Sequence, residues 1–189
     1  TKDTMDLNSS DNPLLSWQME EMKEEQIKLC REEIENSQNR FKSINNPLEK
    51  KDILNTITYW ALKLEDQELI FHTEAQKRTL DRDIENIKSK IISYINQAKD
   101  VVANINSNLY NDPKLLQNKE FRSHLRQIFL NLYSASSKIR ILGFNERAEE
   151  LRELSSVFVE RPEGFSKELF QYLQKIHKIQ EIPDELTHI

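Results

Sequence analysis

The chain has 189 residues, of which 37% are hydrophobic and 31% charged, with a formal net charge of −5, two glycines and one cysteine. This length suits one substantial domain or two small ones, and the mild negative charge argues against bulk attraction to nucleic acid or to an anionic membrane. Loops that cradle phosphate need glycine for positive φ or close backbone approach, so the scarcity of glycine also disfavours nucleotide-binding enzymes.

The first residues carry no folding signal. Residues 1–12 have mostly short, polar side chains, which is typical of a disordered lead-in. The chain begins at Thr1 rather than at a methionine, so we expect an excised fragment or a processed product. Asn12-Pro13 then combines a capping side chain with a proline suited to the first helical position. The pattern predicts a helix from Pro13 to about Ile44.

The next helix start, Asn46-Pro47, opens the longest stretch without a helix breaker. Neither glycine nor proline recurs until Pro113, so a helix from Pro47 to about Ile105 would be roughly 90 Å long if it were unbroken. The sequence leaves that continuity open. The second half of the stretch carries a regular apolar seam with a further apolar column beside it, which indicates several neighbours in a multi-helix bundle. The seam comprises Leu80, Ile84, Ile87, Ile91, Tyr94, Ala98, Val101 and Ile105.

Three shorter helices are predicted after Asp112-Pro113. The first of them carries the most regular heptad series in the chain, which comprises Phe121, Leu125, Ile128, Leu132, Ala135, Ile139 and Leu142. Gly143 follows this series at a position where a helix C-terminus favours a left-handed residue. Pro162 and Pro183 end the two helices that come next.

Together these signals predict an all-α fold. We expect a long, coiled-coil-like helical hairpin that continues into a C-terminal antiparallel helical bundle, with about five helices. The hairpin is assigned to residues 13–79, the bundle to 80–182, and a tail to 183–189. Short connections force neighbouring helices to run antiparallel, which would place the first helix along the first half of the second and the third along its second half.

No catalytic site, metal site or cofactor is expected. Glu68 and His72, like His177 and Glu181, have one-turn spacing, but a di-iron bundle needs carboxylates from four helices and two Glu-x-x-His pairs. Cys30 lies on the apolar seam of the first helix, where cysteine usually behaves as a small buried hydrophobe. A single cysteine excludes an internal disulfide and favours a reducing, cytoplasmic location. No stretch is apolar enough to predict a transmembrane segment.

One stretch has a local positive balance. Lys119, Arg122 and Arg126 recur at three- and four-residue spacing, so they share one helix face. Such a stripe could follow a phosphate backbone, which makes a nucleic-acid-associated helical domain the alternative interpretation. The interpretation we favour is an exposed face paired with the acidic fourth helix. The acidic residues concerned are Glu146, Glu149, Glu150 and Glu153.

Bulky apolar side chains point to the main functional prediction. Trp17, Trp60 and Phe71 are hard to bury in a two-helix hairpin, so they require a third helix or a partner. We therefore predict a non-catalytic helical module for protein–protein interaction or oligomerisation, within a regulatory or scaffolding segment. Its expected partner is another protein or a second copy in a two-fold homodimer, and nucleic acid is less favoured. The expected interface comprises Trp17, Met19, Met22, Ile27, Ile34, Trp60, Leu64 and Phe71.

Overall fold

All regular secondary structure in the described part of the chain is helical, which confirms the expected all-α class. The computed structural model describes residues 13–105, 112, 114–159, 166–180 and 184–189. The predicted lead-in over residues 1–12 lies outside them. The α-helices are α2 (Pro13–Ser43), α3 (Pro47–Leu64), α4 (Gln67–Asn104), α5 (Lys119–Ile141), α6 (Asn145–Ser156) and α7 (Ser166–Lys178), and the 3-10 helices are η2 (Leu115–Gln117) and η3 (Asp184–Leu186).

The helices form two compact units. The first comprises the described residues of Thr1–Asn45 and Glu49–Leu80, and the second comprises those of Asn46–Leu48 and Asp81–Ile189. Helix α4 contributes its first part to one unit and the remainder to the other.

The stretch after Pro47 is two helices rather than one. Helix α3 ends at Leu64, and Glu65 adopts a left-handed backbone conformation with φ of 55°. Asp66 then caps α4, because its Oδ1 accepts a hydrogen bond from the Leu69 amide at 3.1 Å. The continuity that the sequence left open is therefore decided: the stretch from Pro47 to Ile105 is interrupted, since Glu65 takes a left-handed conformation and Asp66 caps the next helix.

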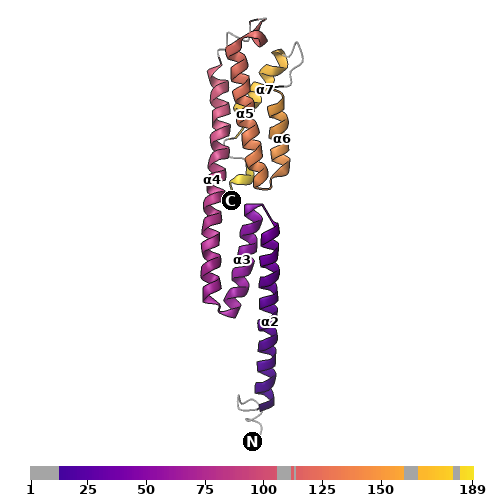
Figure 1. Ribbon diagram of the computed structural model, residues 1–189. Helices are drawn as coiled ribbons and strands as arrows, with labels where there is room; N and C mark the ends of the chain where they lie inside the picture. Colours follow the sequence, from indigo (N-terminus) through magenta and orange to yellow (C-terminus); the bar gives the residue numbers. More distant parts are fainter. Residues whose placement is uncertain (1–12, 106–111, 113, 160–165, 181–183) are drawn as a thin grey trace. The chain divides into compact units, whose positions relative to one another are not determined.

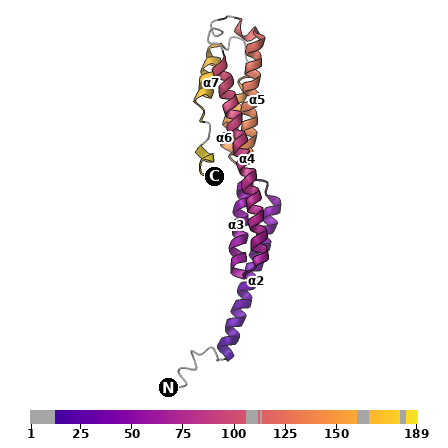
Figure 2. The same ribbon diagram turned by 90° about the vertical axis from the view of Figure 1, so that its left-hand side faces the viewer.

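This break gives the first unit a third helix. Figures 1 and 2 show α2, α3 and the first part of α4 side by side. The core of the unit holds the buried side chains of Ile34, Ile53, Leu54 and Ile57. Partly buried side chains from all three helices pack against this core. They are Phe41, Ile44, Trp60, Leu64, Leu69 and Leu80.

The second unit is built around α5. Residues from α4, α5, α6, α7 and both 3-10 helices join one buried cluster, and these helices lie together in Figure 1. The predicted heptad series of α5 is buried along its whole length, which confirms that this face is the core face. The last six residues, which were predicted to belong to a tail, pack against this unit instead. Leu186 is only 1% exposed and belongs to the same cluster.

Candidate interaction surfaces

The N-terminal part of α2 extends past the end of α3. Helix α2 has 31 residues and α3 has 18, and the short connection at residues 44–46 makes the two antiparallel. The excess of 13 residues (31 − 18) corresponds to about 20 Å of helix, and Figure 1 shows this part of α2 continuing beyond α3. We call residues 13–25 the projecting segment.

The projecting segment carries uncovered apolar side chains. Trp17, Met19 and Met22 have exposed fractions of 60%, 62% and 61%. Met22 and Leu29 are seven residues apart, so Met19, Met22 and the exposed Leu29 share one side of α2. Trp17 lies about half a turn away from this methionine stripe. The sequence pattern did not single out Leu29, although its heptad spacing from Met22 was a usable signal.

A groove of about 750 Å³ lies beside the projecting segment, where α2 passes the end of α3. We call it the α2–α3 groove. Its apolar lining comprises Ile27, Leu29, Cys30, Trp60 and Leu64, and its polar lining comprises Lys23, Gln26, Arg31, Lys63, Glu65 and Asp66.

Lys63 is held at this groove by aromatic rings. Its Nζ lies 4.8 Å from the centre of the Tyr59 ring and 5.3 Å from that of Trp60, so both rings offer their faces to the cation. A side-chain hydrogen bond with Tyr59 raises the pKa of Lys63. The groove therefore combines an apolar lining with a fixed positive charge.

The structure separates the predicted interface residues into three groups. Ile34 is buried in the core of the first unit, so it serves packing rather than an open surface. Ile27, Trp60 and Leu64 are partly buried and line the α2–α3 groove. The exposed members are Trp17, Met19, Met22 and Phe71.

The predicted basic stripe lines a second groove, of about 500 Å³, at the start of α5. Lys119, Arg122 and Arg126 are exposed and share this groove with Ser123. Its remaining lining comprises Phe158 and Val159. Ser123 follows Lys119 by four residues, so helical spacing could have predicted its place in the groove. Phe158 and Val159 lie after α6, and only the tertiary structure shows that they line the groove.

We predicted that the acidic fourth helix, which is α6, pairs with this stripe, but its Glu149 and Glu150 have other partners in the structure. Glu149 pairs with Arg140 at 2.9 Å, and Glu150 pairs with Arg147 of its own helix at 3.4 Å. Within the described ranges, no carboxylate lies within ion-pair distance of the three stripe cations. The reason is geometric: α6 folds back along α5, so its glutamates near residue 149 lie beside the C-terminal half of α5.

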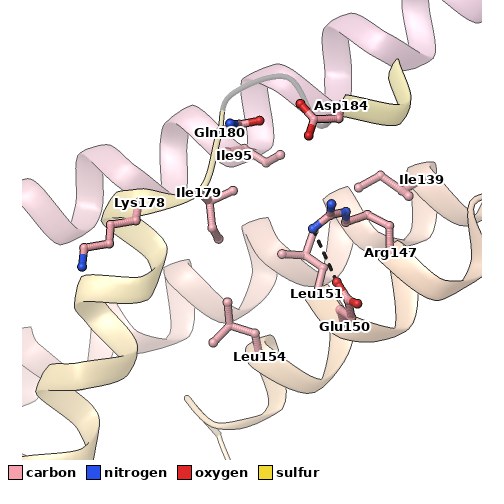
Figure 3. A pocket seen from close by; sticks show the side chains of 10 residues that line it. All are labelled: Ile95, Ile139, Arg147, Glu150, Leu151, Leu154, Lys178, Ile179, Gln180 and Asp184. Carbon is pink, nitrogen blue, oxygen red and sulfur yellow. Dashed lines mark hydrogen bonds and ion pairs between the residues drawn. The ribbon is translucent and has the colours of Figure 1, made fainter. Parts of the chain in front are cut away.

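A third hollow, of about 380 Å³, lies among α4, α5, α6 and the segment after α7 (Figure 3). Its aliphatic lining comprises Ile95, Ile139, Leu151, Leu154 and Ile179, and its polar lining comprises Arg147, Glu150, Lys178, Gln180 and Asp184. Figure 3 shows the Arg147 guanidinium turned toward Glu150. Because Arg147 also pairs with Glu185 at 3.2 Å, its charge serves to hold η3 against α6.

We expect the Arg147–Glu185 contact to weaken in acid. A hydrogen bond from its own backbone amide, assisted by Arg147, lowers the pKa of Glu185. A lowered folded-state pKa means that the stabilisation is complete above the unfolded-state pKa of about 4.3 and is lost as the pH falls through the folded value. Urea unfolding of wild type and Glu185→Gln should differ at neutral pH, by no more than about 1 kcal/mol for a half-exposed pair.

This difference should shrink as the pH drops below about 4. Glu153→Gln, which changes an exposed glutamate of α6, is the control and should track wild type at each pH. A wild-type advantage over Glu185→Gln that is independent of pH would contradict the assignment.

The histidines and the cysteine were considered as possible metal ligands or reactive groups. Among the residues that the structure describes, no group of three His, Cys, Asp or Glu side chains is placed to hold a metal ion. His72 is exposed on α4, and Cys30 is buried with a free thiol. Across the described helices, none offers a stretch long and apolar enough to cross a bilayer.

Comparisons with protein-family models, curated proteins and solved structures found no match to this chain. Its function is therefore argued from the three surfaces described above.

Proposed function

We propose that this chain is a helical self-association module, in which the projecting segment of α2 pairs with a second copy. The observation that carries this proposal is the methionine stripe, which none of the described residues covers. A helix of about this length is marginal in water without tertiary contacts. A partner that packs on the stripe would both stabilise the helical conformation and remove apolar surface from water.

The buried area requires more than the projecting segment. Two such segments side by side would bury a few hundred Å² per copy, worth several kcal/mol at about 25 cal/mol per Å². A stable interface usually buries about 800 Å² per partner. The α2–α3 groove, which adjoins the segment, supplies further apolar surface through Trp60 and Leu64. We therefore include this groove in the proposed interface.

Charge complementarity favours an antiparallel arrangement. The projecting segment is acidic, with Glu20, Glu21, Glu24 and Glu25. The groove, which shares Lys23 with the segment, has three cations, Lys23, Arg31 and Lys63, against two carboxylates, Glu65 and Asp66, and so a small positive excess. In an antiparallel two-fold dimer, the start of each α2 meets the groove end of the other, so acidic and basic side chains face each other twice.

The test is the mass in solution of wild type and of Met19→Glu with Met22→Glu, measured by light scattering across a dilution series. We expect wild type to have twice the 22.5 kDa chain mass. The double variant should raise the dissociation constant by at least about tenfold per methionine, because each buried methionine contributes about 1.5–3 kcal/mol. Glutamate is as good a helix former as methionine, so α2 itself should remain helical.

A matched control places the same two charges elsewhere. Leu130 and Tyr133 are exposed on α5 with the same three-residue spacing, and Leu130→Glu with Tyr133→Glu should leave the dimer intact. A wild-type chain that remains monomeric at high micromolar concentration would overturn the proposal.

The remaining parts of the proposal rest on the sequence. We assign the module no catalysis of its own and a structural role within a larger regulatory or scaffolding protein. Its cytoplasmic location is supported by the use of cysteine, since Cys30 is a free thiol with an apolar role.

A further inference from the structure

We propose that the basic groove at the start of α5 binds a phosphorylated side chain of a partner protein. The groove gathers Lys119, Arg122 and Arg126 around Ser123 in a space of about 500 Å³. A phosphomonoester carries close to two negative charges and three strong acceptor oxygens, which suits two guanidinium groups, an ammonium and a hydroxyl. This binding is independent of the self-association proposed for the first unit.

The first support is that the three groove cations of α5 lack the ion pair that Arg140 makes further along the helix. Toward its C-terminus, Arg140 donates a hydrogen bond to Glu149 at 2.9 Å. Toward its N-terminus, no described carboxylate pairs with any of the three groove cations.

The second support is that the arrangement is unfavourable without a ligand. Arg122 follows Lys119 by three residues and precedes Arg126 by four, and like charges at these spacings repel each other. Lys119 and Arg122 also lie in the first turn of α5, where the helix dipole favours anions over cations. Such unfavourable local arrangements are typical of functional sites. A bound anion would reduce both the repulsion between the cations and their unfavourable interaction with the helix dipole.

The third support is the apolar wall, which favours a peptide over nucleic acid. Phe158 is buried and Val159 is partly exposed, so the groove offers aliphatic contact rather than a free ring on which a base can stack. The basic run covers eight residues from Lys119 to Arg126, whose ends lie about 10 Å apart along the helix axis. A longer polyanion would extend beyond this run toward the exposed glutamates of α6, in a chain with net charge −5.

The test uses the full chain and a pool of fluorescent peptides with a central phosphothreonine and randomised flanks. The same pool with unmodified threonine is the reference. We expect the phosphorylated pool to bind and the reference pool not to bind. Arg122→Ala and Arg126→Ala should each weaken binding by about tenfold, as expected for loss of a charged hydrogen bond. Arg140→Ala, which removes an exposed cation from the same helix, should leave the affinity unchanged.

Two further measurements separate this proposal from its competitors. Inorganic phosphate should compete with the peptide pool, and a single-stranded RNA oligonucleotide should bind more weakly than the peptides. Circular dichroism of each variant checks that a loss of binding is not a loss of fold. Equal binding of the two peptide pools, no binding of either, or tighter binding of the RNA would each overturn the proposal. The dimer would be untouched by any of these results.

Discussion

Leu125→Ala should lower the free energy of unfolding of the second unit by about 2–5 kcal/mol. Leu125 lies on α5 with 0% of its surface exposed, inside the cluster that joins residues from α4, α5, α6 and α7. Shortening it removes the transfer free energy of the lost methyl groups and leaves a cavity that packed neighbours fill only in part. Urea unfolding followed by circular dichroism at 222 nm measures the change.

Leu130→Ala is the matched control for this substitution. It makes the same chemical change on the same helix, five residues later, but Leu130 is 53% exposed. Its effect should stay within about 0.5 kcal/mol, as for most surface substitutions. Equal losses for the two variants would contradict the assignment of the buried face of α5.

Gly143→Ala should lower the free energy of unfolding by about 2–3 kcal/mol, which combines a backbone effect with the loss of a helix cap. Gly143 lies two residues after the end of α5 and has a φ of 92°, a conformation in which a side chain clashes with the backbone. A Cβ at this position would also meet the side-chain amide of Asn46. Asn46 caps α3, because its Oδ1 accepts a hydrogen bond from the Leu48 amide at 2.9 Å. Rotation of Asn46 away from the new methyl group would relieve the clash but break this cap.

A double-mutant cycle separates the two contributions. Asn46→Ala alone should cost about 1 kcal/mol, the usual value of a helix N-cap. In the Asn46→Ala background, Gly143→Ala should cost only its backbone part, about 1–2 kcal/mol, because the cap is already absent. Strict additivity of the two substitutions would show that Gly143 does not act through Asn46.

Much of the fold was predictable because its signals are local. The heptad series from Phe121 to Leu142 has helical spacing, and one face of α5 is buried as that spacing requires. Gly143 has the left-handed conformation that the end of a helix favours. The short connection before Pro47 makes α2 and α3 antiparallel. Each of these features depends on residues close together in the chain.

The break at Glu65 was harder to predict for an energetic reason. Glycine and proline are the usual signals for a helix end, and this break has neither. Glu65 accepts a strained left-handed conformation, while Asp66 begins the next helix through its side-chain cap. The gain comes from packing, since the turn brings Leu69 and Leu80 of α4 against the core of the first unit. Tertiary contacts can thus offset a local cost that the sequence pattern does not display.

The sequence by itself determined that this chain is helical, where most helices begin and end, and which residues are candidates for an interface or a basic stripe. Only the tertiary structure decided which candidates remain available. It buried Ile34 and left Met19 and Met22 exposed, and it paired Glu149 and Glu150 of α6 with arginines outside the basic stripe. The physical reason is that periodicity assigns a residue to one face of its helix, whereas helix lengths and chain reversals decide what lies opposite that face.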